Sequence, residues 1–339
     1  MCGIAGIVGG RRHAVDIHDM LNALRHRGPD DVGVWSDEHA TLGQRRLSII
    51  DLAGGHQPLH NEDESLWVVC NGEIYNYLAL REDLIRKGYR FLTGSDCEVI
   101  LHLYAEYGAR CLEHMRGMFA FALWDVRKRT LFAARDHLGQ KPLYYAEHQG
   151  RLLFASEIKA IVAAEPALRQ LDPEALDQYL ALRVIGSPRS MFAGVRKLPP
   201  GHWLRFAEAS GLEIGRYWDL SYEPKLEGSD EELTDRLEQE LIEALRLHMV
   251  SDVPVGAFMS GGMDSTLLVA MLMTHVTDTP IPTFTLSLPH EKFNEGPFAR
   301  LVAERYGTEH HEEQVTPSLV SLLPKMVWHL DEPSDPLSL

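Results

Sequence analysis

The sequence predicts an α+β sandwich of stacked sheets, followed by an α/β domain built on a parallel sheet. The length of 339 residues is too great for one ordinary core, so two domains are expected. Short apolar segments such as Met118–Trp124 and Thr130–Ala134 recur between turn residues, a pattern typical of stacked sheets. Later in the chain strand-like and helix-like segments alternate, as in Val253–Met259 and Asp264–His275, which indicates parallel strands joined by helices.

Composition and charge exclude several classes of protein. Apolar residues make up 45% of the chain and charged residues 24%, which excludes wholesale disorder. The 33 basic and 49 acidic side chains sum to −16, and this excess of negative charge repels nucleic acids and anionic lipids. No apolar run approaches the ~20 residues that cross a bilayer, so neither a nucleic acid nor a membrane is expected as a partner.

The cysteines indicate the compartment. Cys2, Cys70, Cys97 and Cys111 form no Cys-x-x-Cys pair and show no metal-binding spacing. Disulfide frameworks are typical of much smaller secreted chains, and no basic-then-apolar leader opens this one. We therefore expect free thiols and a cytoplasmic protein.

Local signals predict the elements of the first domain. Cys2–Val8 is small and apolar, as in a buried strand, and Leu66–Cys70 has the same character. Asn76 is expected to cap a helix over Tyr77–Lys87. Ser95–Glu98 has the spacing of a capping box, which predicts the start of another helix.

A domain boundary is expected after the Pro-Pro-Gly turn at residues 199–201. Ser229–Glu232 is a second capping box, and it precedes a helix whose leucines are spaced by four. We therefore expect a first domain at 2–205, a junction at 206–228 and a second domain at 229–339. Only two strand–helix units are evident in the second domain, so we expect it to be incomplete or covered by a partner.

Cys2 is the first candidate for chemistry. A small residue after the initiator permits removal of Met1, which leaves Cys2 at the N-terminus. Its own α-amine, with a pKa of ~8, can then take the thiol proton directly or through water, so the nucleophile needs no histidine. The alternative is that Cys2 merely follows the initiator and packs as a small apolar side chain.

Four other segments carry groups that such a nucleophile would need. Asn71 and Gly72 form either a hairpin turn or, through the Asn amide and the Gly N–H, an oxyanion hole. The arginines within residues 42–51 are either surface charges or bidentate partners of a carboxylate. Asp96 either belongs to a helix cap or receives an ammonium group. Residues 26–30 are either a structural turn or a segment that orders a loop over a site.

Taken in order, these motifs resemble the class II glutamine amidotransferases, which are N-terminal-nucleophile hydrolases with an αββα sandwich. The likeness rests on Cys-Gly-Ile at the start, Arg-His-Arg-Gly-Pro-Asp from Arg25, Arg-Leu-Ser-Ile from Arg46, Asn-Gly-Glu-Ile-Tyr-Asn from Asn71 and Gly-Ser-Asp-Cys-Glu from Gly94. Met-Phe-Ala-Phe-Ala-Leu-Trp and Arg-Asp-His-Leu-Gly-Gln-Lys-Pro-Leu-Tyr-Tyr extend it to about residue 160.

The resemblance implies a role for each motif. Cys2 would attack the side-chain amide of glutamine, and Asn71 and Gly72 would hold the oxyanion. Arg46, which directly precedes Leu-Ser-Ile, would bind the α-carboxylate of the substrate, and Asp96 would bind its α-amine. The implied glutamine site comprises Arg46, Leu47, Ser48, Ile49, Ile50, Asn71, Gly72, Glu73 and Asp96.

A second motif, Ser260–Ser265, lies between a predicted strand and a predicted helix. Gly261 and Gly262 let the backbone approach an anion, which the Ser hydroxyls and the amides of the helix N-terminus can then bind as a phosphate. Asp264 could hold Mg²⁺ bound to that phosphate. The alternatives are a plain glycine turn and a helix cap, and the segment lacks the Gly-Lys-Ser/Thr of a Walker loop.

This loop resembles the pyrophosphate-binding loop of ATP pyrophosphatase domains, in which ATP is split into AMP and pyrophosphate while a carboxylate is adenylated. Behind a class II glutaminase domain, it makes the chain similar to the glutamine-hydrolysing asparagine synthetases. The likeness implies an ATP site, with Mg²⁺ at Asp264, that comprises Met259, Ser260, Gly261, Gly262, Asp264, Ser265 and Leu286. The segments that complete the acyl-adenylate site in that family are expected after residue 339.

The implied function is glutamine-dependent and ATP-dependent amide synthesis, with aspartate as the acceptor and asparagine as the product. Three alternatives stay open: an amidotransferase that acts on another carboxylate, a chain with glutaminase activity only, and an inert interaction protein that retains the motifs. The implied partners are glutamine, ATP, Mg²⁺ and aspartate or a similar carboxylate. Uncovered apolar faces in the second domain also predict a homo-oligomer.

Overall fold

The computed structural model describes residues 1–10, 14–287, 294–315 and 319–333. Their contacts divide the chain into two compact units. The first unit is Met1–Leu220 with Lys325–Leu339, and the second is Ser221–Pro324. Among the described residues, no helix has both the length and the apolar character needed to span a bilayer.

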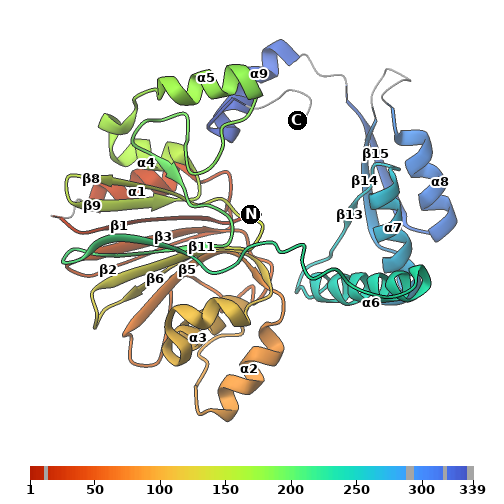
Figure 1. The fold of residues 1–339 in the computed structure, drawn as a ribbon, viewed down its shortest axis with the longest axis horizontal. Coiled ribbons are helices and arrows are strands. Elements are labelled where there is room, and N and C mark those ends of the chain that lie inside the picture. The colour runs from red at the N-terminus through yellow and green to blue at the C-terminus, as the bar shows by residue number, and fades with distance from the viewer. Residues whose placement is uncertain (11–13, 288–293, 316–318, 334–339) are drawn as a thin grey trace. The chain divides into compact units, whose positions relative to one another are not determined.

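The first unit contains two six-stranded sheets (Figure 1). The first sheet has the order β10-β8-β9-β1-β3-β2, and its neighbouring strands pair antiparallel. The bounds of its strands are β1 Gly3–Val8, β2 Asp31–Ser36, β3 Ala40–Arg46, β8 Tyr144–His148, β9 Arg151–Ala155 and β10 Arg196–Lys197.

The second sheet has the order β12-β11-β7-β6-β5-β4, again with antiparallel neighbours. Its strands are β4 Leu59–His60, β5 Leu66–Ile74, β6 Gly117–Asp125, β7 Thr130–Arg135, β11 His202–Ala207 and β12 Gly211–Arg216. Because β12 pairs with β11, this sheet continues into residues 206–228, where the sequence predicted a junction.

Apolar side chains hold the two sheets face to face. Leu42, Trp124 and Phe154 are almost completely buried in one cluster that draws on both sheets. On the outer face of the first sheet lie α1 (Ala14–Ala23) and α4 (Ile158–Ala164), whose buried residues form a second cluster with β1 and β9. On the outer face of the second sheet lie α2 (Tyr77–Arg86) and α3 (Val99–Tyr107) (Figure 1). The predicted αββα sandwich is therefore confirmed.

Two predicted helix caps differ from the structure. Asn76 precedes α2, but its side chain makes no cap hydrogen bond; its amide group instead bonds to His114 and Arg116. Ser95 caps a short 3-10 helix through the N–H of Cys97, whereas Glu98 accepts hydrogen bonds from residues 92 and 93 rather than closing a capping box. In both cases a partner outside the expected cap binds the side chain: a distant segment for Asn76 and the preceding loop for Glu98.

The second unit has a parallel sheet, as predicted. Strands β13 (Ala257–Phe258), β14 (Pro282–Ser287) and β15 (Glu309–Gln314) pair in that order. Helices α7 (Met263–Met271) and α8 (Gly296–Tyr306) contribute to a small core with Met259. The preceding helix, α6 (Asp230–His248), begins with the predicted capping box of Ser229 and Glu232.

Two further α-helices belong to the described chain, which also has short helical segments at Gly108–His114, Pro166–Leu168 and Leu272–Val276. The helix α5 (Pro173–Leu182) belongs to the first unit. The helix α9 (Leu319–Leu330) begins in the second unit, and its residues from Lys325 onward belong to the first unit. Asp331, Glu332 and Pro333 therefore belong to the unit that contains Cys2.

Candidate active site around Cys2

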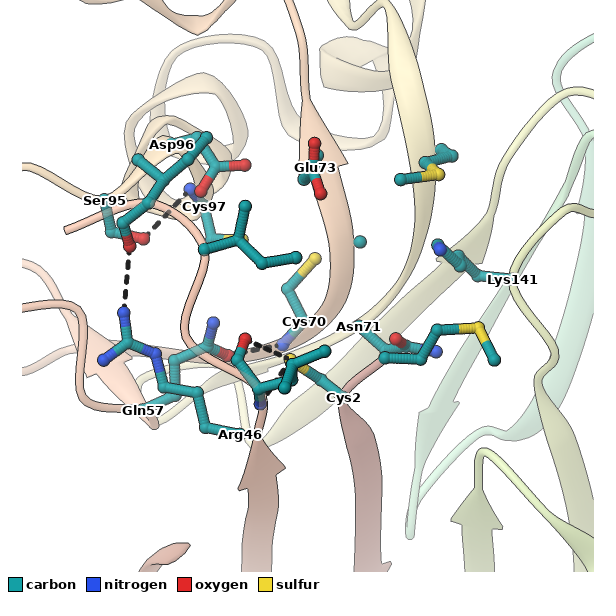
Figure 2. A pocket seen from close by; sticks show the side chains of 16 residues that line it. Cys2, Arg46, Gln57, Cys70, Asn71, Glu73, Ser95, Asp96, Cys97 and Lys141 are labelled. Atoms are coloured by element: carbon teal, nitrogen blue, oxygen red, sulfur yellow. Dashed lines mark hydrogen bonds between the residues drawn. The ribbon is translucent and has the colours of Figure 1, made fainter. Parts of the chain in front are cut away.

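A cavity of about 220 Å³ opens beside Cys2 in the first unit. Segments far apart in the sequence supply its wall: the two residues before β1, the loop after β3, the end of β5 and the turn before α3 (Figure 2). The lining residues are Met1, Cys2, Arg46, Leu47, Ile49, Ile50, Gln57, Cys70, Asn71, Gly72, Glu73, Ser95, Asp96, Cys97, Met118 and Lys141.

Cys2 is fixed by main-chain contacts. Its Sγ accepts a hydrogen bond from the N–H of Leu47 at 3.4 Å and donates to the carbonyl oxygen of the same residue at 3.6 Å. The carbonyl oxygen of Cys2 accepts from Nε of Arg27 at 2.9 Å. Burial raises the pKa of the Cys2 thiol, and burial lowers the pKa of the Met1 α-amine. Both groups are therefore held toward their neutral forms.

Asn71 brings unpaired polar atoms to the cavity. Its side chain is only 1% exposed, and neither its Oδ1 nor its Nδ2 makes a hydrogen bond among the described residues. Buried polar groups are rarely left unpaired, because each costs about 1–3 kcal/mol. A ligand oxygen in the cavity would accept from Nδ2 and remove part of that cost.

The hairpin-turn alternative for Asn71 and Gly72 is wrong, because both lie within β5 and pair with β6. Close packing also explains the glycine. A Cβ atom at residue 72 would lie 2.1 Å from the carbonyl oxygen of Met118, so no larger residue fits. The main chain can therefore approach a ligand here without a side chain in the way.

Arg46 is buried, so it is not the surface charge of the alternative interpretation. Its side chain is 6% exposed, and Nη2 donates to the carbonyl oxygens of Ile50 at 2.9 Å and Asp51 at 2.7 Å. These bonds hold the loop after β3 around the cavity. Leu47, Ile49 and Ile50 of that loop line the cavity. Ser48 is absent from the lining, and its N–H donates to Asp30 instead.

Two carboxyl groups line the same cavity. Asp96 is 4% exposed and accepts a hydrogen bond from the N–H of Ile74 at 2.9 Å. Burial raises the pKa of Asp96. Burial, together with the nearby Asp96, raises the pKa of Glu73. With Arg46 as a cation, the cavity offers both signs of charge, as a zwitterionic amino acid would require.

Seven residues that line the cavity were not predicted as site residues, among them Lys141, Gln57 and Met118. Lys141 is 8% exposed, and burial lowers the pKa of its ammonium group. Gln57 accepts from the N–H of Cys70 at 2.7 Å and so orients β5 beside the nucleophile. Met118 closes the cavity next to Gly72. Lys141 and Met118 lie in motifs that the sequence had singled out, whereas Gln57 follows no motif.

The predicted phosphate-binding loop lies in the second unit, between β13 and α7. The Oγ atoms of Ser260 and Ser265 lie 3.0 Å apart, and the former accepts from the N–H of Gly262 at 3.2 Å. Gly261 has a φ of +79°, which a residue with a side chain rarely adopts. The loop therefore has the curled main chain and helix N-terminus that suit a phosphate.

The remaining residues of the predicted ATP site differ in exposure. Leu286 is 65% exposed on β14, whereas Met259 is 2% exposed and packs in the core. Met259 can therefore contact a nucleotide only through its main chain. Asp264 is exposed in the first turn of α7. Among the described residues no group of three His, Cys, Asp or Glu side chains could hold a metal ion. One carboxylate nevertheless fits Mg²⁺ that is bound mainly by phosphates.

Comparison with known proteins accounts for both units. The sequence model of the glutamine amidotransferase domain matches residues 1–218, and that of asparagine synthase matches residues 236–339. Asparagine synthetase (glutamine-hydrolyzing) 1 of Bacillus subtilis is 37% identical over 349 residues, which cover 100% of this chain and 54% of the relative. A Methanocaldococcus jannaschii protein provisionally named asparagine synthetase (glutamine-hydrolyzing) 2 is 35% identical over 360 residues, or 98% of this chain and 68% of that protein. The chain belongs to the glutamine-hydrolysing asparagine synthetase family.

Proteins similar to this chain are not all named asparagine synthetases. The amidase chry2 of Gibberella zeae is 35% identical over 369 residues, which cover 98% of this chain and 54% of the amidase. The chain spans about half the length of the curated relatives from Bacillus and Gibberella.

A solved structure of an allosteric regulatory enzyme of purine biosynthesis has a TM-score of 0.51 and 16% identity, covering 94% of this chain and 81% of the other. That likeness is one of fold alone.

Alkylation of Cys2 tests the pKa of its thiol. Because burial raises this pKa above the ordinary value of 9.0, the thiol stays protonated at neutral pH. The rate of reaction with iodoacetamide should then rise about tenfold per pH unit from about pH 7 to about pH 9, without levelling off, since only the thiolate reacts. Peptide mass spectrometry on the chain that retains Met1 measures this rate, with glutathione as the reference thiol. A plateau below about pH 8 would contradict the expectation.

Proposed function

We propose that the full-length protein makes asparagine from aspartate, with ammonia from glutamine and energy from ATP. Residues 2–205 would form the glutaminase domain, 206–228 the junction and 229–339 the first part of the synthetase domain. The observation that carries the proposal is the cavity in which Cys2 shares a wall with the unpaired amide of Asn71. Membership of the asparagine synthetase family supports it.

The proposed glutaminase step begins after Met1 has been removed. The α-amine of Cys2 accepts the thiol proton while Sγ attacks the amide carbon of glutamine. Nδ2 of Asn71 and the N–H of Gly72 donate to the oxyanion of the tetrahedral intermediate. The C–N bond then breaks, and the departing nitrogen takes a proton from the amine and leaves as ammonia. Water hydrolyses the thioester, which releases glutamate and restores the thiol.

The proposed binding of glutamine follows from the charges around the cavity. Arg46 would bind the α-carboxylate, and Asp96, with Glu73 nearby, would bind the α-ammonium group. The loop after β3 holds Arg46 through two carbonyl oxygens, and the N–H of Ile74 holds Asp96. These two groups are therefore in place before substrate arrives. Leu47, Ile49 and Ile50 would provide apolar contacts to the substrate side chain.

The proposed synthetase step uses the loop of the second unit. Gly261, Gly262 and the two serines of this loop would bind the pyrophosphate of ATP, and Leu286 would contact the base or sugar. Asp264 would hold Mg²⁺, which neutralises phosphate charge when bound. The acceptor carboxylate attacks the α-phosphorus of ATP and releases pyrophosphate. Ammonia then attacks the acyl carbon and releases AMP, which leaves the amide.

A different acceptor carboxylate is the second candidate function. The amidase of Gibberella zeae is as similar to this chain as several synthetases are, although it has another name. A comparison of aspartate with other carboxylic acids, in full-length protein with ATP and glutamine, decides between the two by the mass of the amide. We also place the protein in the cytoplasm, because all four cysteines are free thiols and the proposed chemistry requires Cys2 reduced.

Insertion of one alanine between Met1 and Cys2 tests the role of the terminal amine. Processing would then expose alanine, and Cys2 would keep its thiol but lose its own amine. Glutamate release should fall at least about 100-fold, to the level of Cys2→Ala. Met1 is 59% exposed, so the fold should tolerate the insertion, which circular dichroism checks. Unchanged activity, or an active wild type that retains Met1 by mass spectrometry, would exclude this mechanism.

Asn71→Ala tests the proposed oxyanion hole. Loss of Nδ2 should lower the kcat of glutamate release by about 10²–10³-fold, because this donor acts mainly on the transition state. The KM for glutamine should change by less than about threefold. Asn22→Ala, on the exposed face of α1, is the matched control and should have wild-type kinetics. Equal activity of both variants would remove Asn71 from the mechanism.

Gly261→Ala tests the phosphate loop. A Cβ at this residue would lie 2.7 Å from the main-chain nitrogen of Ala299, so the loop must shift. Titration calorimetry with Mg-ATP should show affinity at least tenfold weaker than that of wild type. Gly307→Ala is the control, since Gly307 has a similar φ of +69° but open space around it. If both variants bound ATP as wild type does, the loop would not be the nucleotide site.

A further inference from the structure

The acidic pair Asp331–Glu332 follows α9 and packs on the unit that contains Cys2. We call this pair the C-terminal clasp. Its side chains are largely buried: Asp331 is 6% exposed and Glu332 is 12% exposed. The clasp lies in the part of the chain that matches asparagine synthase, although its contacts are with the glutaminase fold.

Each acid of the clasp binds both a main-chain N–H and a lysine. Asp331 accepts from the N–H of Ile158 at 2.6 Å and pairs with Nζ of Lys159 at 2.9 Å. Glu332 accepts from the N–H of Met191 at 2.7 Å and pairs with Nζ of Lys197 at 2.7 Å. Asp331 thereby binds the first turn of α4 from a position more than 170 residues away in sequence.

A continuous chain of charged contacts leads from Asp331 to the nucleophile. Lys159 lies between two carboxylates, because its Nζ is also 2.5 Å from Oε2 of Glu157. The other oxygen of Glu157 accepts from Nη1 of Arg27 at 2.7 Å. Nε of Arg27 donates in turn to the carbonyl oxygen of Cys2 at 2.9 Å. Three side chains therefore connect the clasp to the main chain of Cys2.

The members of this chain are buried and charged. Glu157 is 7% exposed, Arg27 is 8% and Lys159 is 13%. Although burial alone would raise the pKa of Glu157, its hydrogen bonds with Lys159 and Arg27 leave that pKa lowered. Glu157 is thus an anion with two cationic partners. Removal of its charge would take the carboxylate partner from buried Arg27 and leave Lys159 with Asp331 as its remaining one.

The backbone at Asp331 is a second, independent observation. Its φ is +65°, in the left-handed region, and its N–H closes the end of α9 on the carbonyl oxygen of Val327. Glycine is the favoured residue at such a helix end, and asparagine is also tolerated. The chain carries aspartate there instead, whose carboxylate makes the contacts with α4 and Lys159.

We propose that Glu157, Lys159 and Asp331 are positioning residues for Cys2, so that docking of the C-terminal clasp sets the glutaminase rate. The inference rests on the proposed function, since it concerns the reaction at Cys2. Asp331 accepts a hydrogen bond from the N–H of Ile158, the residue after Glu157, and it also pairs with Lys159. Loss of these contacts frees Glu157, and Arg27 then no longer holds the carbonyl oxygen of Cys2 in place. A misplaced nucleophile lowers the rate even when the cavity still binds substrate.

Variants of Asp331 test the proposal without disturbing the backbone. Asp331→Asn keeps an oxygen for the N–H of Ile158 but loses the ion pair, whereas Asp331→Gly loses both and suits the positive φ. We expect the kcat of glutamate release to fall about fivefold and about twentyfold, respectively, with the KM for glutamine within about twofold of wild type. Glu157→Gln should lower kcat at least as far as Asp331→Gly.

The control is Glu165→Gln. Glu165 pairs with Arg151 at 2.6 Å, is 15% exposed and directly follows α4, but it is not part of the chain of contacts that leads to Cys2. It should keep wild-type kcat. A thermal melt of each variant separates positioning from loss of fold. The clasp variants should have a lower kcat than wild type even at assay temperatures far below their Tm.

A double-mutant cycle identifies the route of the effect. If Asp331 acts through Lys159, then Asp331→Asn should change kcat little in a Lys159→Met background. If the two residues acted independently, the fold-changes in kcat of the two single variants would multiply in the double variant. Lys159→Arg, which keeps the charge, should retain most of the rate. Wild-type kcat in both Asp331 variants would overturn the inference and leave the proposed function intact. Absence of glutamate release from the wild type, and no labelling of Cys2 by a glutamine-like diazoketone, would instead overturn the proposed function.

Discussion

The antiparallel pairing of β1 with β3 is the constraint on which the site depends. The register runs from Gly3 opposite Arg45 to Val8 opposite Ala40, and β9 pairs with the other edge of β1. Cys2 directly precedes this ladder, and Leu47 directly follows its partner strand. The contact between the Cys2 thiol and the Leu47 main chain is therefore a consequence of strand register, and a slip of one residue would reverse the face on which every side chain of β1 lies.

Stacking of the second sheet on the first supplies the other half of the cavity. Asn71 and Gly72 pair with β6 as ordinary members of a ladder, so their positions are fixed by the sheet rather than by a flexible loop. The unpaired amide of Asn71 costs free energy that the surrounding apolar core must offset. Such a donor, held in place before charge develops, needs no reorganisation during reaction, which is the condition for strong stabilisation of an oxyanion.

Short-range patterns predicted the parts of the fold that depend on neighbours in sequence. The capping box at Ser229 is correct because both of its partners lie within one turn. The expected caps at Asn76 and Glu98 are wrong because the amide of Asn76 binds residues about 40 positions away and the carboxylate of Glu98 turns back to residues 92 and 93. The same limit applies to the site. Motifs pointed to Cys2, but no pattern indicates that Gln57 would face Cys70.

Burial has an effect on the proposed mechanism that the motif alone does not convey. It raises the pKa of the thiol, and in the chain that retains Met1 it lowers the pKa of the Met1 α-amine. Transfer of a proton from the thiol to an amine at this buried place creates two charges, so it is less favourable than in water. The thiol is therefore neutral at rest. In the proposed mechanism, loss of the thiol proton is favourable only when the negative charge passes from sulfur to the substrate oxygen, where Asn71 and Gly72 would donate hydrogen bonds. The same burial that makes the thiol a weak nucleophile at rest thus couples its activation to the arrival of an amide in the cavity.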